Sequence, residues 1–525
     1  GDGRLVHELL RRGVDAYGIE ESSGPLALAR RVGAERFREG SLWSLPFADD
    51  AFETLVCTYR LERLQREQVP RAISELRRVT RRSLILYIGT DGVLDADWLG
   101  TAAGREWWEE SCLSAGLRKH PAYYLLNAYE ALEGPVRTIV APFEKIGESV
   151  VQALRKHGLE QQHILHRDML REEGRRSDAH CVRYAEAARW IRPGDYVLDV
   201  ACGLGYGSYQ LWHGSQAARV TGIDSCAEAI GYATRCFACT PELEYRVGDA
   251  HTLDGIADNS IDFVAGFETI EHLPNPAAYL DAIRRVLRPS GRLMISAPND
   301  WADESGQDPN PHHLHVYDWE RLRSEVGSGL LLEQGWLQTA GGARRLHHHR
   351  REWLTVDPQR PLPKDGEWIL LLAMKSPVSG EGVPYQERIW EIPHDPDFNV
   401  SAFARDYANP WLVKGMVAIG MRSTSAANLQ EIRSGVLANA VSDSVDYGAA
   451  LCGEVYAVLS DVECAEEGAR NLLARIDDYE AAAGDGPHHL RWKVSLLFAG
   501  AELALSRGWR QDARELYLRC AEYDV

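Results

Sequence analysis

The sequence predicts an α/β protein in which two domains with parallel β-sheets precede an α-helical region. Three observations predict this organisation. An apolar strand, a glycine-rich turn, a helix and a second strand follow one another over residues 197–224. Parts of the same pattern occur earlier, over residues 1–79. From residue 446 onward the apolar residues recur with helical spacing instead.

The central pattern begins with Val197-Leu-Asp-Val-Ala-Cys-Gly-Leu-Gly-Tyr-Gly207, a buried strand that runs into a glycine turn. Glycines in such a turn let the backbone approach a ligand that any Cβ would block. Asp199 precedes the glycines, whereas a dinucleotide site shows G-x-G-x-x-G without that acid. The next strand, Val220-Thr-Gly-Ile-Asp224, ends in the acid that folds of this kind place on ribose hydroxyls.

Four further segments follow in a fixed order. Tyr245-Arg-Val-Gly-Asp249-Ala250 reads as a short strand ending in an acid. Residues 260–267 form a nearly continuous apolar run, typical of a strand buried on both faces, and lead into Glu268-Thr-Ile-Glu271-His272-Leu273. Residues 282–291 read as a helix with a Pro-Ser-Gly turn, and residues 292–298 as another strand.

These residues resemble motif I and the later motifs of class I S-adenosylmethionine (SAM) methyltransferases, which have a Rossmann-like fold. The resemblance implies that Asp224 binds the ribose and Asp249 the adenine amino group, while the amide after Asp249 reads the ring. It also implies that the loop after Phe267 lies beside the transferred methyl group. A helix-capping turn in another Rossmann-like domain would explain the glycines but not the segments that follow.

A helical segment over residues 165–180 leads into Arg183-Tyr184. It resembles the lid that caps SAM in this family, in which case Arg183 could pair with the methionine carboxylate and Tyr184 could cover the sulfonium. The alternative is a surface arginine and a packing tyrosine. The residues expected to bind the cofactor are Arg183, Tyr184, Asp199, Ala201, Gly203, Gly205, Asp224, Ser225, Asp249, Ala250, Phe267 and Glu268.

The beginning of the chain resembles a second copy of this domain. Residues 1–20 look like another motif I whose first strand lies before residue 1. The other matching pairs are 46–57 with 256–265, 61–64 with 270–273, and 72–79 with 282–286. Two methyltransferase-like domains in tandem are therefore expected.

The two copies differ where the chemistry is expected. Glu20 keeps the ribose-binding acid, but Ser41 replaces Asp249 and Arg63 replaces His272. The first change removes the adenine contact, and the second replaces a titratable imidazole with a permanent cation. The first copy is therefore expected to be degenerate. The competing interpretation is a second active site with different acceptor chemistry.

The segment Asn299 to Trp319 is expected to determine the acceptor. Pro309 and Pro311 forbid a helix, so it should form an extended loop at the carboxyl ends of the strands, where open α/β sheets bind ligands. It resembles a turn of methyltransferases that act on sugars and cell-surface glycan precursors. Its acids, amides, histidines and aromatic planes suit a polyhydroxylated acceptor. The alternative is a histidine-rich turn packed against the sheet.

Methylation of a hydroxyl gains from a general base, for which histidine is suited near neutral pH. The candidates are His272, His313 and His315 in that order, with Glu271 beside the first. An amine acceptor would need only its lone pair, and the histidines would then orient it. Asp303, Asp308 and His312 raise a metal-assisted alternative, but their spacing matches no ligand pattern and no metal is assigned.

Composition narrows the function classes. A chain of 525 residues predicts about three domains. The net charge of −19 disfavours a nucleic-acid binder. Ten scattered cysteines, including Cys236 and Cys239 as a lone C-x-x-C, indicate reduced thiols. No apolar stretch approaches the length of a membrane span, and a cytoplasmic location is expected, although the chain starts without Met and a leader stays open.

The last part of the chain predicts helices over 446–459, 462–482, 490–506 and 511–523. They resemble tetratricopeptide-like repeats, although no clean period emerges, and such regions more often bind a partner or mediate self-association. The expected domains are a degenerate copy at 1–147, a catalytic copy at 148–376 and a helical interaction domain at 385–525.

The sequence as a whole predicts a SAM-dependent methyltransferase that methylates a hydroxyl of a sugar or glycan-linked intermediate. Two alternatives remain. One is N- or O-methylation of another small metabolite, and the other is a non-catalytic scaffold of methyltransferase-like domains.

Overall fold

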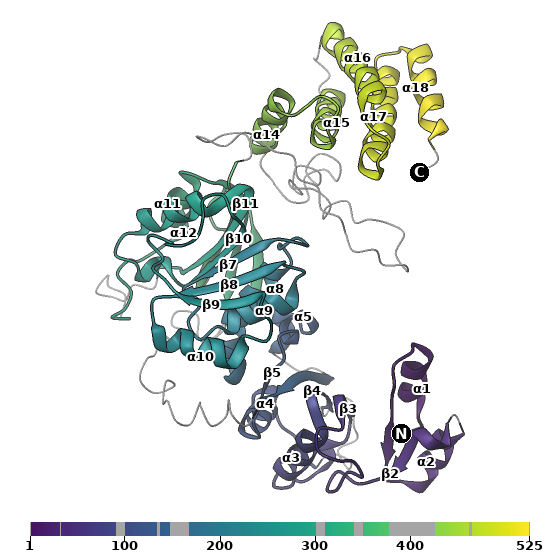
Figure 1. Ribbon diagram of the computed structural model, residues 1–525, viewed down its shortest axis with the longest axis vertical. Helices are drawn as coiled ribbons and strands as arrows, with labels where there is room; N and C mark the ends of the chain where they lie inside the picture. Colours follow the sequence, from purple (N-terminus) through teal and green to yellow (C-terminus); the bar gives the residue numbers. More distant parts are fainter. Residues whose placement is uncertain are drawn as a thin grey trace.

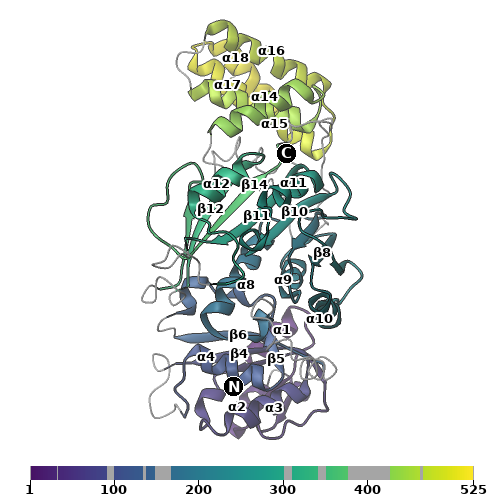
Figure 2. The same ribbon diagram turned by 90° about the vertical axis from the view of Figure 1, so that its left-hand side faces the viewer.

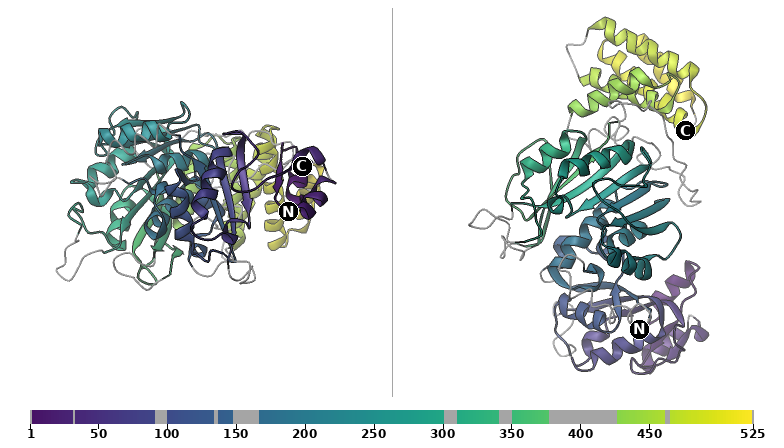
Figure 3. Two further views of the ribbon diagram at one scale, coloured as in Figure 1. Left: turned by 90° about the horizontal axis from the view of Figure 1, so that it is seen from below. Right: turned by 60° about the vertical axis from the view of Figure 1, so that its left-hand side comes forward.

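The computed structural model describes residues 2–31, 33–90, 100–133, 137–147, 167–300, 310–340, 350–376, 426–460 and 465–523. Figures 1, 2 and 3 show a smaller α/β region at one end, a larger α/β region in the middle and a bundle of helices at the other end. The expected fold class is confirmed. Residues 148 and 385 lie outside the described residues, and the three domain boundaries stay predictions.

The middle region is built on an eight-stranded sheet. Its five parallel strands are β9 (Leu243–Val247), β8 (Arg219–Asp224), β7 (Tyr196–Val200), β10 (Ile261–Phe267) and β11 (Leu287–Pro298), in that spatial order. The antiparallel strands β14 (Trp368–Met374), β12 (Leu331–Thr339) and β13 (Glu352–Val356) extend the sheet from β11. Every residue of β10 and β14 is buried, because helices cover both faces.

The helices of this region are α8 (Gly174–Ala188), α9 (Tyr206–Gly214), α10 (Ala227–Phe237), α11 (Pro276–Val286) and α12 (Trp319–Gly327). Strand order reverses beside β7, where the chain goes first to β8 and β9 and then crosses back to β10. In open α/β sheets the carboxyl ends of the strands at such a reversal form the ligand-binding edge.

The first region repeats this topology in two separate pieces. One is a parallel pair of β1 (Gly18–Glu20) and β2 (Phe37–Glu39). The other has the order β3 (Phe52–Thr58), β4 (Thr80–Gly89), β6 (Thr138–Lys145) and β5 (Leu117–Lys119). These pieces match β8–β9 and β10–β11–β14–β12 of the second copy. No strand among the described residues of this region occupies the position of β7, as expected for a copy whose first strand is missing.

The repeat extends to individual hydrogen bonds. Asp50 and Asn259 both adopt a left-handed backbone, with φ of 55° and 50°. The amide of the first donates to the carbonyl of Arg78 and that of the second to Arg285, at 2.9 and 3.0 Å. Both arginines also donate to carbonyls of the turn that precedes the strand. The two copies therefore share a turn as well as an order of strands.

The helices of the first region are α1 (Arg4–Arg11), α2 (Ser23–Arg30), α3 (Val69–Val79), α4 (Arg105–Ser114) and α5 (Tyr123–Leu126). A continuous apolar core joins this region to the second copy. Polar groups of β5 and β6 also reach α8, α9 and α10. The buried ammonium of Lys119 lies 3.4 Å from Asp178 on α8, Tyr209 on α9 donates to Glu144 at 2.8 Å, and Arg118 donates to the carbonyl of Cys236 on α10 at 3.0 Å.

The C-terminal region consists of α14 (Ala426–Asn439), α15 (Val445–Ser460), α16 (Glu466–Ala482), α17 (Pro487–Ser506) and α18 (Arg510–Glu522), which share an apolar core. The four helices expected from the sequence correspond to α15–α18. Over the residues that the structure describes, no helix has both the length and the apolar character needed to cross a membrane.

Burial of Asp446 in this core makes the stability of the helical region depend on pH. Asp446 lies in the first turn of α15 and is fully buried, and burial raises its pKa from 3.8 to about 7. Between these values the unfolded chain releases the proton while the folded chain keeps it, so stability falls as pH rises from about 4 to about 7. A shift of about three units corresponds to about 4 kcal/mol at most.

We therefore expect Asp446→Asn to raise the thermal midpoint of this region at pH 8 but not at pH 4. The measurement is thermal unfolding of the whole chain, followed by circular dichroism at both pH values. Asp443→Asn, at an exposed position just before α15, is the matched control. Equal pH dependence in the wild type and in Asp446→Asn would contradict this assignment.

Candidate active site

The glycine turn after β7 has an unusual backbone. Ala201, Gly203 and Gly205 are left-handed, with φ of 58°, 55° and 86°. Such values are rare for alanine, and a strained residue of this kind is often found at a ligand-binding turn. A Cβ at Gly205 would overlap Ala233 and the ring of Tyr245. The turn thus brings bare backbone to the carboxyl edge of the sheet, where the sequence predicts the cofactor.

Asp224 ties this turn to the end of β8. One carboxylate oxygen accepts the amide of Gly203 at 2.9 Å and the other accepts that of Cys226 at 2.8 Å. Ser225 beside it is exposed and Ala250 is half-buried. Asp249, after β9, is largely exposed and accepts both the amide and the ring nitrogen of His251 at 2.8 Å. The His251 amide, as the largest cause, lowers the pKa of Asp249.

Tyr184 lies beneath the turn. A Cβ at Gly207 would overlap its ring, which packs edge-on against Phe267 with centroids 4.9 Å apart. Its hydroxyl donates to Asp199 at 3.3 Å, and Ser208 donates to the same carboxylate at 2.7 Å. Burial raises the pKa of Asp199 to about 7. Tyr184 packs as the alternative interpretation expected, and its predicted contact with the sulfonium stays a prediction.

Arg183 is fully buried and bound to another predicted cofactor residue. Its guanidinium lies 3.0 Å from the carboxylate of Glu268 and donates to Gln338 at 2.7 Å. Ser296 and Trp368 also donate to Glu268, each at 2.8 Å. The structure therefore brings Arg183 and Glu268 together, and a methionine carboxylate at Arg183 would compete with Glu268. The partners Gln338, Ser296 and Trp368 were not expected, because they come from distant strands.

The chain reverses sharply after β10, where Glu268 has a φ of 50°, and a short 3-10 helix over Ile270–His272 follows. This turn places Glu271 and His272 against the segment after β11. Glu271 is buried, and its carboxylate oxygen lies 3.9 Å from Nε2 of His272. Two amides, those of Leu314 and His315, donate to the carbonyl of Glu271 at 2.8 and 3.2 Å.

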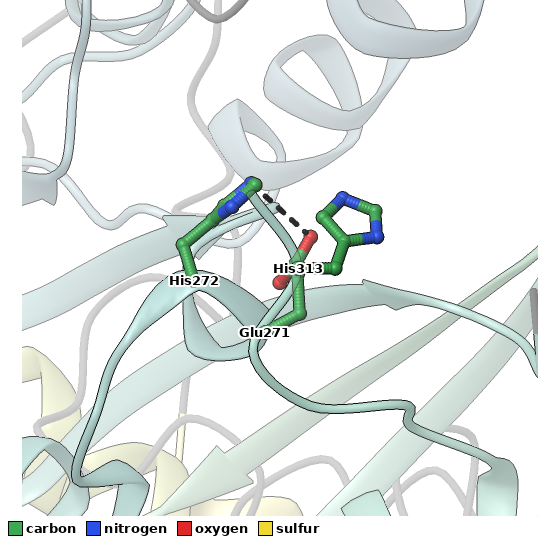
Figure 4. Close-up of side chains that lie close together, drawn as sticks. All are labelled: Glu271, His272 and His313. Atoms are coloured by element: carbon green, nitrogen blue, oxygen red, sulfur yellow. Dashed lines mark ion pairs between the residues drawn. The ribbon is translucent and has the colours of Figure 1, made fainter. Parts of the chain in front are cut away.

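The imidazoles of His272 and His313 lie on either side of the Glu271 carboxylate (Figure 4). Their ring centroids lie 4.8 Å apart. Nδ1 of His272 lies 2.8 Å from the carbonyl oxygen of His312, and the side chain of Asn310 lies 2.8 Å from Nε2 of His313. Burial is the largest cause that lowers the pKa of His272. Three of the four candidate catalytic residues thus form one cluster, which His315 joins through its backbone.

Two aromatic residues that the structure describes in this segment take another role than expected. Tyr317 and Trp319 are buried in the core, where Tyr317 donates to Glu325 and Trp319 to the carbonyl of Arg360, each at 2.8 Å. They pack against the sheet, which the alternative interpretation expected, and present no exposed plane to an acceptor. Asp303 and Asp308, considered above as metal ligands, lie outside the described residues.

The first copy keeps the backbone of this site without its imidazoles. Tyr59 has a φ of 54°, a 3-10 helix over Leu61–Arg63 follows, and two amides donate to the carbonyl of Glu62 at 2.9 Å. Glu20, which matches Asp224, accepts the amide of Ser22 at 2.9 Å and pairs with Arg60 at 2.7 Å. Arg60 is therefore paired with the carboxylate that corresponds to the expected ribose-binding acid of the second copy.

Comparison with known proteins identifies both α/β regions. Residues 198–295 match one family model described as a methyltransferase domain, and residues 1–83 match another with the same description. A protein of Mycolicibacterium smegmatis named as a probable S-adenosylmethionine-dependent methyltransferase is 33% identical over 177 residues, 33% of this chain and 66% of that protein. The ubiquinone biosynthesis O-methyltransferase of Xanthomonas campestris pv. campestris is 35% identical over 114 residues, 22% of this chain and 47% of that protein.

The chain thus spans less than two thirds of the length of these curated relatives. A solved structure of a SAM-dependent methyltransferase from Aquifex aeolicus has a TM-score of 0.26 and 19% identity, covering 35% of this chain and 84% of that one. The family models and curated relatives place class I SAM-dependent methyltransferase domains in this chain, and SAM is the cofactor of that type.

Proposed function

We propose that this chain, which carries two domains of the class I SAM-dependent methyltransferase type, transfers a methyl group from SAM to a hydroxyl at its second domain. One observation carries the proposal. The strained glycine turn, Asp224 and Asp249 line the same carboxyl edge of the sheet as the cluster of Glu271, His272 and His313. The residues expected to bind the cofactor and a set of acid–base groups therefore belong to the same edge of the sheet.

The cofactor supplies an electrophilic methyl group on its sulfonium, and the protein must place a nucleophile about 3 Å from it in line with the bond that breaks. The glycines of the turn have no Cβ and would let the backbone lie directly against the cofactor. Asp224 would accept the ribose hydroxyls, and Asp249 the adenine amino group. Arg183, through Glu268, would fix the loop that faces the methyl group.

The acceptor that we propose is a hydroxyl of a sugar or glycan-linked intermediate. A hydroxyl has a high pKa, so transfer gains from a base in the cluster, with His272 the first candidate and His313 and His315 after it. Glu271 would stabilise the imidazolium. The name of the Xanthomonas relative, an O-methyltransferase, supports oxygen as the acceptor atom, and an amine acceptor is the alternative.

The other regions have supporting roles in this proposal. The ion pair between Glu20 and Arg60 and the serine at position 41 support a first copy that binds SAM weakly or not at all. The helical C-terminal region would bind a protein partner or a second copy of the chain.

The direct test is incubation of the purified chain with SAM labelled in its methyl group and with matched panels of nucleotide sugars, free sugars, phenols and amines. We expect label to enter hydroxyl-bearing acceptors and S-adenosylhomocysteine to form in equal amount. Label found only in amines would contradict O-methylation. Absence of transfer to any acceptor, together with absence of SAM binding, would favour the scaffold alternative.

A further inference from the structure

We propose that Glu271, His272 and His313 bind a divalent first-row metal ion of the zinc type. Each residue offers one ligand atom, and these atoms lie within 4.8 Å of one another. Among the described residues, this group of two histidines and one acid brings its possible ligand atoms close enough to share one ion. Two imidazoles and one carboxylate form a ligand set that suits zinc and leaves a fourth position open for a ligand from outside.

The surroundings hold the ligands as a metal site requires. A metal-binding imidazole usually donates its other ring N–H to a carbonyl or carboxylate, which fixes the ring and leaves the second nitrogen as the ligand. His272 has this arrangement, because Nδ1 lies 2.8 Å from the carbonyl oxygen of His312 while Nε2 faces Glu271. The side chain of Asn310 lies 2.8 Å from Nε2 of His313, so this contact orients the second ring and leaves its Nδ1 as the nitrogen for an ion.

The two halves of the site come from segments about forty residues apart, and the backbone locks them together. The carbonyl of Glu271 accepts the amides of Leu314 and His315, the two residues that follow His313. The three side chains therefore meet through two fixed turns. Zinc–nitrogen distances are about 2.0–2.1 Å, so small side-chain rotations would close the cluster around an ion.

The first copy shows that the fold does not itself require the imidazoles. It has a left-handed residue, Tyr59, at the position of Glu268, followed by a 3-10 helix with a buried Glu62. Two backbone amides donate to the carbonyl of Glu62, as two do to that of Glu271. There Arg63 replaces His272. The carboxylate of Glu62 instead accepts the amide of Gly89 at 3.0 Å. The turn is thus formed without the histidines, and we attribute them to ligand binding.

This inference deepens the proposed function and, in its chemical role, rests on it. An acceptor hydroxyl bound at the open position would have its pKa lowered by the ion, so that its proton leaves to water. The oxygen would then take the methyl group as the sulfur–carbon bond breaks, leaving S-adenosylhomocysteine. His272 would in this case be a ligand, because an imidazole that holds an ion with Nε2 cannot accept a proton there.

The test of binding uses the whole chain without SAM or acceptor. The chain is stripped with a chelator and titrated with Zn²⁺ alone by calorimetry, and Co²⁺ is added to a second sample to record its visible spectrum. Residues His347, His348 and His349 are replaced with glutamine in every sample, because this run is another source of imidazoles. We expect one site with a tetrahedral Co²⁺ spectrum.

Variants assign that site to the cluster. His272→Ala and His313→Ala should each weaken Zn²⁺ binding by about 100-fold, and Asn310→Ala by about tenfold, as for residues that orient a ligand. His251→Ala, which removes the imidazole beside Asp249, is the matched control and should leave the affinity unchanged. No Zn²⁺ site, or unchanged affinity in His313→Ala, would overturn the proposal.

The role of the ion is tested apart from its binding. If Zn²⁺ binds at the cluster but the stripped chain methylates its acceptor at full rate, the chemical role is overturned. If SAM does not bind while Zn²⁺ does, the proposed function fails and the metal site stands. Restoration of turnover by Zn²⁺ or Co²⁺ after stripping would support both.

Discussion

Replacing Asp224 with alanine is expected to remove SAM binding from the chain. The carboxylate should accept the ribose hydroxyls, and it already holds the amides of Gly203 and Cys226, so its loss removes ligand contacts and loosens the glycine turn together. Hydrogen bonds to a charged group contribute about 1.5–3 kcal/mol each, and the loss of two corresponds to at least about a 100-fold rise in Kd. Calorimetric titration of SAM into the whole chain and into Asp224→Ala measures it.

Glu20→Ala is the matched control, because Glu20 holds the corresponding position in the first copy. Arg60 occupies its carboxylate, and we expect this variant to bind SAM as the wild type does. Two sites in the wild type, with one surviving in Asp224→Ala, would show a working first copy and contradict its degeneracy. Circular dichroism of each variant checks that it is folded. No binding to the wild type would refute the proposed function.

Replacing His272 with alanine is expected to lower kcat by about 10²–10⁴-fold while the Kd for SAM stays within about twofold. His272 belongs to the cluster proposed to face the acceptor, whereas the acids expected to hold the ribose and the adenine follow β8 and β9. As a base or as a metal ligand it acts on the acceptor hydroxyl. Initial rates at saturating SAM, with calorimetry for SAM affinity, separate the two effects. Unchanged turnover would refute both roles.

The pH profile and a chelator distinguish these roles. Burial lowers the pKa of His272, so a free base there would be active above a pKa that lies below 6.5 and would lose activity as pH falls through it. This loss of activity at low pH should be absent from the residual turnover of His272→Ala. A metal-bound His272 should instead give turnover that a chelator removes and Zn²⁺ restores. His489→Ala, in α17, removes an imidazole elsewhere and should leave turnover unchanged.

Local sequence patterns predicted the strands and turns that carry the expected cofactor residues, because each of these parts is contained in a few consecutive residues. Glycines followed by Asp224 predict a strand, a turn and a second strand without knowledge of the rest of the chain. The repeat was visible for the same reason, since its turns and helices recur in order. The split sheet of the first copy follows directly from a missing strand.

Contacts between distant strands could not be predicted in this way. Arg183 was expected to face the cofactor, but which group it meets depends on Glu268, Gln338 and Trp368, which lie 85 or more positions further along the chain. The cluster of Glu271, His272 and His313 likewise depends on how two loops pack. The burial of Tyr317 and Trp319 shows the same limit, since an aromatic residue in a loop can face a ligand or the core.

The packing of β5 and β6 against α8 and α9 makes the stability of the second copy depend on the presence of the first. Lys119 is fully buried between Glu109 of its own copy and Asp178 of the other. A shortened chain that starts at residue 167 would remove one of the two buried cations beside Asp178, leaving Arg351 at 2.7 Å, and would expose the flank of the helix that follows the glycine turn. A first copy without catalytic activity of its own would then still be required, because it stabilises the fold of the second copy.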